Sequence, residues 1–223
     1  MTHYVKSNPS FFSQYIITMK LSNCSVLILL YFVVFGLNKF NLYHLEKKSE
    51  RFYQTKENYK KVQDIFHSIL PHFEHFEYAS DALTLLVIGY LAIMNFELIY
   101  HLGGLIFTLV LLRQFIIPIT ILPKNTICDI SDTSMFRGGC YDKIFSAHFG
   151  ITFLTTLILF DNGLINNMVA ILINLVNGMF ILLSRNHYTI DIVVSIFVVI
   201  IIYQNNLNIC EYLDKYMEKI NIV

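Results

Sequence analysis

Two histidines, one aspartate and one arginine are the residues whose types and spacing could do chemistry in this chain. His187 and Asp191 stand four positions apart, and residues with that spacing lie on one face of a helix. The carboxylate can then accept a hydrogen bond from one imidazole nitrogen, which leaves the other nitrogen as a nucleophile or base. His148 and Arg113 complete a set typical of phosphate handling. One histidine attacks phosphorus, the other donates a proton to the leaving oxygen, and the arginine neutralises the phosphate oxygens.

Each of these residues also has an ordinary structural interpretation. A lone His-x-x-x-Asp pattern in a soluble helix is most often a surface pair, and a single histidine such as His148 is more often a helix-end residue than a catalyst. Arg113 alone could snorkel toward an interface or pair with Asp81 or Glu97. A charged side chain inside a membrane span is costly and usually functional. The joint occurrence of these residues beside predicted spans therefore favours a site.

The composition indicates a membrane protein. The chain has 223 residues, of which 55% are hydrophobic and 14% charged, and its mean hydropathy is +0.55. Soluble domains carry about 25% charged residues. The formal net charge is zero, so the sequence gives no sign of a nucleic-acid partner.

Long apolar runs predict an all-α integral membrane protein with about six transmembrane helices. A span needs about 20 residues of helix, and backbone groups inside lipid must be satisfied within each span. The predicted spans are about 21–37, 82–99, 102–122, 144–160, 164–183 and 188–203. Residues 1–20 would form a short N-terminal tail that does not look like a cleaved signal peptide, and residues 204–223 a polar C-terminal tail.

Three ordered motifs resemble those of the sphingomyelin synthases. The segment 140–148 is similar to that family's C-x-D-x-x-F-S-G-H motif, and the segment 187–191 reads H-Y-T-I-D as in the family. The segment 113–123 resembles its R-x6-T-x-L-P motif, and the segment 64–71 fits the family more loosely. The likeness covers about residues 60–205.

The resemblance implies a six-helix bundle of the lipid phosphatase (PAP2) superfamily and a two-step reaction without metal or cofactor. His187 would be the nucleophile, Asp191 its orienting partner and His148 the acid and base. A phosphocholine-type head group would pass from phosphatidylcholine to ceramide through a phosphohistidine, releasing diacylglycerol. The other expected site residues are Arg113, Ser146 and Arg185 for the phosphate and, on weaker grounds, Tyr141, Asp142 and Tyr188 for the head group or lipid.

Other activities of the superfamily stay open. Its phosphatases carry K-x6-R-P and S-R-x5-H-x3-D segments, which this chain lacks. A phosphomonoester is nearly a dianion and needs several cations, so the few cations near the motifs favour a phosphodiester. Hydrolysis in the manner of a phospholipase C, or non-catalytic lipid binding, remains an alternative. The head group could be choline, ethanolamine or inositol phosphate, and the acceptor ceramide or diacylglycerol.

Several features leave their interpretation open. The family has glycine and threonine where this chain has Ala147 and Phe149, and Phe149 could alter the lipid pocket. Cys128 and Cys140 could form a disulfide or stay free. A metal site among the histidines of segment 67–75 is disfavoured, because their spacing matches no ligand pattern.

The expected partners are membrane lipids, with a homodimer possible. The family places its active site on the lumenal or outer face of the Golgi, endoplasmic reticulum or plasma membrane. The many lysines and arginines of residues 38–80 oppose that orientation under the positive-inside rule.

Overall fold

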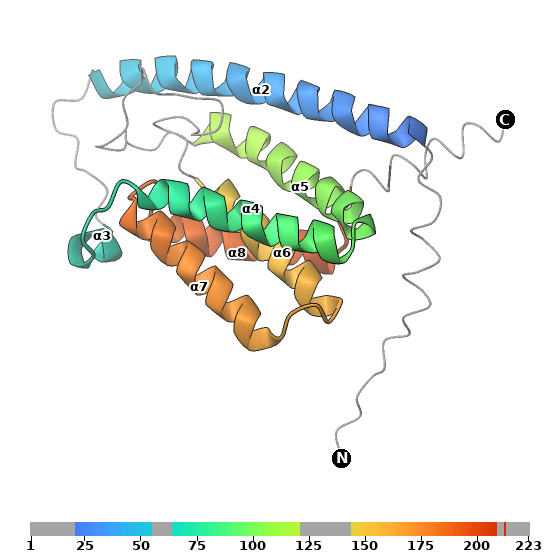
Figure 1. Cartoon of the computed structure of the whole chain (residues 1–223). Coiled ribbons are helices and arrows are strands. Elements are labelled where there is room, and N and C mark those ends of the chain that lie inside the picture. The colour runs from blue at the N-terminus through green and yellow to red at the C-terminus, as the bar shows by residue number, and fades with distance from the viewer. Residues whose placement is uncertain (1–20, 55–63, 121–143, 209–211, 213–223) are drawn as a thin grey trace.

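The computed structural model describes residues 21–54, 64–120, 144–208 and 212. This part of the chain is helical, with no strand (Figure 1). The predictions made for Tyr141, Asp142, Cys128 and Cys140 lie outside the described residues. The elements are α2 (Leu21–Gln54), α3 (Ile65–Ile69), α4 (Phe76–Met94), α5 (Glu97–Ile116), the 3-10 turn η1 (Ile117–Ile119), α6 (Ala147–Asp161), α7 (Asn167–Leu183) and α8 (Thr189–Gln204).

Helix α6 lies at the centre of the bundle and packs against α4, α5, α7 and α8. Helix α2 packs against α5 and η1 and runs along one side of the bundle, as Figure 1 shows. Gln114 of α5 joins these two helices, because its amide nitrogen donates to Asn38 Oδ1 at 3.1 Å and its backbone carbonyl accepts from Asn41 at 3.0 Å. The polar contacts therefore fix the register of α2 against α5.

Short polar side chains and breaker residues set the ends of the helices. Ser146 caps α6 by accepting from the Phe149 N–H, and Asn166 caps α7 in the same way. Gly163, with φ of 68°, forms the turn between α6 and α7 in a conformation that favours glycine. Pro118 follows the end of α5, where its missing N–H stops the regular helix.

The observed helix bounds differ most from the predicted spans at α2, α4 and α5. Helix α2 continues to Gln54, well past the predicted end at Leu37, so the first part of the lysine- and arginine-rich stretch 38–80 is helical. The predicted second span 82–99 is wrong in its bounds, because α4 ends before Asn95 and a new helix begins at Glu97. Asn95 accepts the Glu97 N–H through its side chain, which stabilises this break. A cap of this kind does not change the hydropathy pattern, so hydropathy alone does not reveal where the helix ends.

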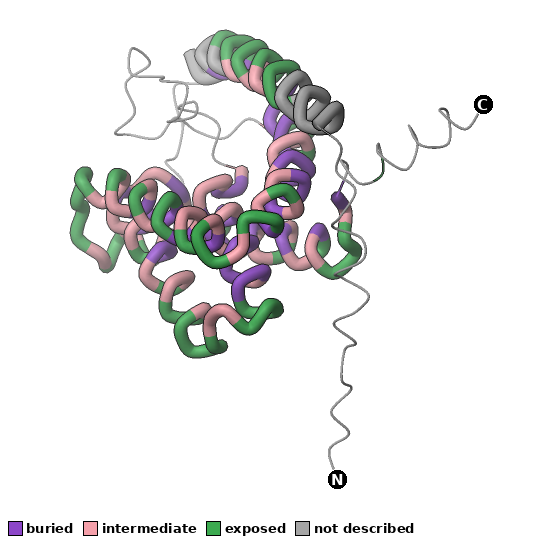
Figure 2. The backbone as a smooth tube through the Cα atoms, turned by 45° about the vertical axis from the view of Figure 1, so that its right-hand side comes forward, coloured by how far each residue is buried: buried purple, intermediate pink, exposed green. Residues whose placement is uncertain are grey.

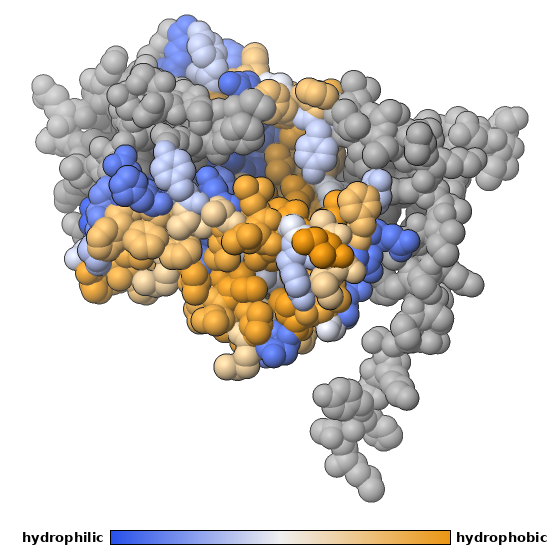
Figure 3. Space-filling view, in the orientation of Figure 1, coloured by the Kyte–Doolittle hydropathy of each residue, from blue (hydrophilic) through white to orange (hydrophobic). Residues whose placement is uncertain are grey.

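Apolar side chains cover much of the outside of the bundle, while polar ones are buried within it. Leu86 and Ile93 of α4 are 70% and 85% exposed, and Leu175 of α7 is 63% exposed. Hydrophobic residues gather on the lower face in Figure 3. Figure 2 shows buried residues where the helices face one another. The buried polar residues of the spans include Ser80, Thr84, Thr152, Thr155, Thr156, Asn177 and Ser195.

This distribution is compatible with a membrane protein, because large exposed apolar surfaces are rare on soluble monomers. Within the described residues, two helices are long and apolar enough to cross a membrane, at Phe76–Met94 and Glu97–Ile119. The apolar helices α6, α7 and α8 are shorter. The count of six spans therefore stays a prediction.

Candidate active site

His187 and Asp191 lie next to each other at the start of α8. The distance from His187 Nδ1 to Asp191 Oδ2 is 3.4 Å. The expectation that both residues share a helical face is wrong, because His187 precedes Tyr188, the N-cap residue of α8. Asp191 instead turns back toward the helix start, where Oδ2 accepts the Tyr188 N–H at 2.8 Å. The carboxylate thus caps the helix and faces His187 at the same time.

Both members of this pair are buried, with 8% of His187 and 1% of Asp191 exposed. A buried carboxylate beside Nδ1 favours the tautomer that carries its proton on Nδ1. That tautomer presents the Nε2 lone pair to a substrate. Ser195, one turn further along α8, donates to the backbone oxygens of Asp191 and Ser146 at 2.7 and 3.0 Å. Its hydroxyl therefore holds the start of α6 against the start of α8.

His148 forms a second histidine–aspartate pair, this time with Asp81 of α4. His148 Nε2 lies 3.1 Å from Asp81 Oδ1, and the two side chains are 40% and 44% exposed. Asp81 was considered above only as a partner for Arg113. The sequence carries one signal that could have found it, which is a carboxylate at the edge of a predicted span beside Ser80.

The two histidines meet in one small pocket at the end of the bundle where α4, α6 and α8 begin and α7 ends. Its volume is about 20 Å³, room for about one water. The residues that line it are Glu77, Ser80, Asp81, His148, Ile181, Ser184, Asn186 and His187. None of these lining residues is a lysine or arginine, so the described pocket combines two histidines with two carboxylic acids.

The residues expected to bind phosphate have other observed contacts. Arg113 lies in the last turn of α5, is 9% exposed and does not line this pocket. Ser146 is fully buried, and its hydroxyl caps α6. Arg185 donates from Nη2 to the backbone oxygen of His67 at 3.0 Å. Phosphate contacts by these three residues stay a prediction.

The structure also places Tyr188, which was expected to bind the head group or lipid, and Phe149, which was expected to alter the lipid pocket. The Tyr188 ring lies against the His67 ring, with 5.5 Å between the ring centroids. Phe149 is 4% exposed and belongs to a cluster with Ile181, Leu182 and Ile192. Phe149 is absent from the residues that line the pocket. Its bulk therefore fills the bundle behind His148.

The loop that carries His187 has a strained backbone. Arg185 adopts a φ of 56°, in the left-handed region that costs a non-glycine residue about 1–2 kcal/mol. The loop spans Ser184–Tyr188, between α7 and α8. Such strain persists only when surrounding contacts over-determine the conformation.

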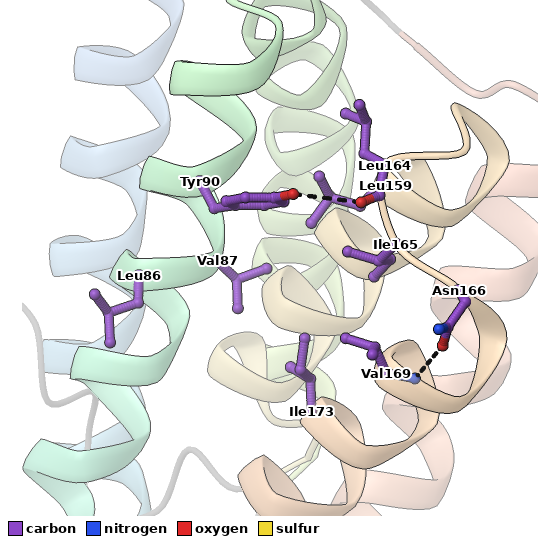
Figure 4. A pocket seen from close by; sticks show the side chains of 9 residues that line it. All are labelled: Leu86, Val87, Tyr90, Leu159, Leu164, Ile165, Asn166, Val169 and Ile173. Carbon is purple, nitrogen blue, oxygen red and sulfur yellow. Dashed lines mark hydrogen bonds between the residues drawn. The ribbon is translucent and has the colours of Figure 1, made fainter.

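A larger cavity lies elsewhere, between α4 and α7 toward the opposite end of these helices. Its volume is about 490 Å³, and its lining is mainly apolar (Figure 4). Tyr90 closes one side by donating to the Leu164 backbone oxygen at 3.3 Å. The cavity contains no histidine or acid among its described lining residues. The candidate histidines line the small polar pocket instead. The described part of the chain has no group of three or more histidine, cysteine, aspartate or glutamate residues able to hold a metal ion.

These features define an all-helical protein with two histidine–aspartate pairs at one end of its bundle. Residues 139–207 match the family model described as PAP2 superfamily C-terminal, a range that includes His148, His187 and Asp191. The match supports the superfamily and, in general, an enzyme of phosphoryl transfer or hydrolysis acting on lipids. It does not distinguish a sphingomyelin synthase from other members. No curated protein matches the chain.

Proposed function

We propose that this protein is a lipid phosphotransferase that moves a phosphocholine-type head group from phosphatidylcholine to ceramide. The observation that carries the proposal is the pairing of each of two histidines with an aspartate at one pocket. Two histidines supply the two functions that such a transfer needs, a nucleophile and a proton donor. The match to the PAP2 superfamily supports the same general chemistry.

In the first half-reaction, His187 Nε2 attacks the phosphorus of the donor lipid. The N–P bond forms as the P–O bond to diacylglycerol breaks. Protonated His148, held by Asp81, gives its proton to the departing oxygen. Asp191 accepts the Nδ1 proton in a hydrogen bond and stabilises the positive charge that develops on the His187 ring.

In the second half-reaction, the ceramide hydroxyl attacks the phosphohistidine. His148, now neutral, takes the hydroxyl proton as the new O–P bond forms and the N–P bond breaks. This step restores His187 with a lone pair on Nε2 and His148 in its protonated state. His148 thus donates a proton in the first half-reaction and accepts one in the second, while His187 carries the phosphorus-bound head group between them.

The charges around the pocket favour a phosphodiester substrate over a phosphomonoester. Glu77 and Asp81 contribute carboxylates, and no lysine or arginine is among the described lining residues. A dianionic monoester would be repelled there, whereas a diester carries a single negative charge that one protonated histidine can balance. In this proposal Arg113, in the last turn of α5, and Arg185, in the loop before His187, are the arginines expected to bind the phosphate.

A second candidate is hydrolysis, with water in place of ceramide. It is supported by the exposure of the His148 and Asp81 side chains and by a pocket that has room for about one water. Water bound beside His148 could attack the phosphohistidine, and the enzyme would then act as a phospholipase C. Diacylglycerol would be a product in both cases, but only hydrolysis would release free phosphocholine.

The test is a lipid-product assay on cells that lack sphingomyelin synthase and express the full chain. The cells receive fluorescent ceramide and mixed phospholipids, and the matched variants are His187→Ala and His44→Ala. His44 is an exposed histidine of α2 outside the pocket. A new phosphosphingolipid that disappears only in His187→Ala supports head-group transfer, and its mobility identifies the head group. Free phosphocholine without that product supports hydrolysis.

Lipid binding that survives His187→Ala, with no product from any donor even when diacylglycerol is offered as acceptor, would contradict both enzymatic proposals. In that case a non-catalytic lipid binder would explain the chain better.

A further inference from the structure

The segment before α4 makes several hydrogen bonds with the loop that carries His187 and with the residue that follows this loop. Residues 64–73, called here the α3 strap, contain α3 and the turn that follows it. They lie outside the 139–207 range of the family match. The strap reaches across the ends of α7 and α8, more than one hundred positions away in the sequence.

Asp64 anchors the strap to the first turn of α8. Its Oδ2 accepts the Thr189 N–H at 2.6 Å, and its Oδ1 accepts the Thr189 hydroxyl at 2.9 Å. The same Oδ1 accepts the His67 N–H at 3.2 Å, which caps α3. One carboxylate therefore receives three hydrogen bonds, two of them from the residue that follows the His187–Tyr188 pair.

His67 contacts the backbone of the proposed nucleophile itself. His67 Nε2 lies 3.1 Å from the His187 backbone oxygen. A carbonyl oxygen only accepts, so Nε2 must carry the proton and donate it. The His67 ring also lies against Tyr188, and the His67 carbonyl accepts from Arg185. The strap thus contacts three residues of the loop, which are Arg185, His187 and Tyr188.

Two more contacts hold the C-terminal part of the strap against the bundle. The Phe73 N–H donates to the Leu183 backbone oxygen at 2.9 Å, where α7 ends. Leu70 packs against the apolar cluster that contains Phe149 and Ile192. The loop between Leu183 and Thr189 is therefore held from both ends and from its middle.

We infer that Asp64 and His67 are positioning residues, which hold the Ser184–Tyr188 loop in the conformation that faces His187 toward Asp191 and the pocket. The inference rests on the proposed function of His187 for its catalytic consequence, but the contacts themselves do not depend on it. Neither residue lines the pocket. Their effect passes through the backbone of His187 and through the first turn of α8, which carries Asp191.

The sharpest test compares two substitutions of the same residue. His67→Gln keeps an N–H donor near the place of Nε2, whereas His67→Phe keeps the ring against Tyr188 and removes the donor. If the donor positions His187, His67→Phe lowers kcat by about tenfold to a hundredfold with little change in KM, because small misplacements of a reacting group have effects of that size. His67→Gln keeps most of the wild-type kcat.

Backbone hydrogen exchange of the purified full chain gives a readout that needs no activity. Peptides covering 185–191 are expected to exchange faster in His67→Phe and in Asp64→Asn than in the wild type or His67→Gln. In Asp64→Asn, the amide nitrogen replaces one of the two oxygens that accept from Thr189. A peptide from the middle of α5, where Leu105 and Leu109 belong to a different apolar cluster from the one that Leu70 packs against, should exchange at the same rate in all variants.

The two readouts separate failure of the inference from failure of the proposed function. Unchanged exchange at 185–191 in both His67→Phe and Asp64→Asn overturns the inference, and so does a His67→Gln variant as impaired as His67→Phe. If the wild type is inactive on every lipid, the proposed function fails, and faster exchange in the variants still supports the positioning role.

Discussion

Asp81 of α4 and His148 of α6 form a pair with 3.1 Å between Oδ1 and Nε2, although they come from different helices. The pair resembles the His187–Asp191 pair in chemistry but differs from it in exposure. A histidine beside a carboxylate is a better proton carrier, because the negative charge stabilises the imidazolium. The more exposed pair suits exchange of protons with substrates, and the buried pair suits attack on phosphorus.

Asp81→Asn is therefore expected to lower kcat by about tenfold or more, because the neutral amide no longer stabilises protonated His148. The measurement is the rate of head-group transfer by purified protein in lipid nanodiscs. Glu97→Gln is the matched control, since Glu97 is an exposed acid at the opposite end of α4 and α5. Equal rates for Asp81→Asn and the wild type would remove Asp81 from the mechanism.

Asp191 has two separable roles, and two substitutions distinguish them. Asp191→Asn keeps an oxygen that can accept the Tyr188 N–H, so the helix cap is largely retained. The loss of charge beside His187 should still reduce kcat by about a hundredfold or more. Asp191→Ala removes the cap as well and should cost about 1 kcal/mol of further stability. Kinetics and thermal unfolding in detergent are measured together. An active Asp191→Asn protein would contradict the orienting role.

Residue type and local spacing select His148, His187 and Asp191 as catalytic candidates, and their catalytic roles stay a prediction. Their partners in space are harder to predict. Asp81, Glu77 and the α3 strap were not placed at the site, because their contacts join residues far apart in the sequence. Hydrophobic runs located the later helices to within a few residues. They could not locate the break at Asn95 or the continuation of α2, which depend on capping and on contacts with α5.

A buried hydrogen bond between α4 and α7 is expected to contribute to stability. Ser80 Oγ donates to Asn177 Oδ1 at 2.7 Å, and both residues are almost fully buried. Ser80→Ala and Asn177→Leu should each destabilise the bundle, and the double variant should lose less than the sum of the two. A coupling of about 0.5–1.5 kcal/mol is expected for an interhelical hydrogen bond. Strictly additive losses in thermal unfolding would show that the two residues act separately.

The side of the membrane that holds the site can be mapped with glycosylation acceptors. The family resemblance favours the lumenal or outer side, whereas the lysines and arginines of the 38–80 segment favour the cytosol. We expect an Asn-x-Thr acceptor inserted within residues 55–63 to be glycosylated in eukaryotic cells, and one added after Val223 to stay unmodified if six spans are present. The reverse pattern would place the site in the cytosol.

The strap should respond to pH through His67, whose surroundings hold its pKa below its ordinary value of 6.5. Burial is the largest cause, and the positive charge of Arg185 acts in the same direction. Asp64, Asp191 and the hydrogen bond to the His187 carbonyl oppose the shift without cancelling it. Burial also opposes ionisation of Asp64, but hydrogen bonds from Thr189 and the other favourable contacts outweigh it and hold that pKa below 3.8.

Both lowered pKa values make the docked strap more stable at higher pH. The folded state binds fewer protons than the unfolded state between the two pKa values of His67, so stability rises with pH there. The contribution of His67 is fully present above pH 6.5 and is lost as pH falls through the lower pKa of the folded state. The contribution of Asp64 is fully present above pH 3.8 and is lost as pH falls through the lower pKa of the folded state.

Protection of residues 185–191 against hydrogen exchange, corrected for intrinsic rates, should therefore decrease as pH falls from about 7 to about 5. His67→Gln cannot titrate in this range, so its protection should stay level until Asp64 is protonated. Activity alone is a poorer readout, because the proposed reaction itself moves a proton on and off His148. A decrease of the same size in His67→Gln would assign the pH response to another group facing the strap, such as Asp191.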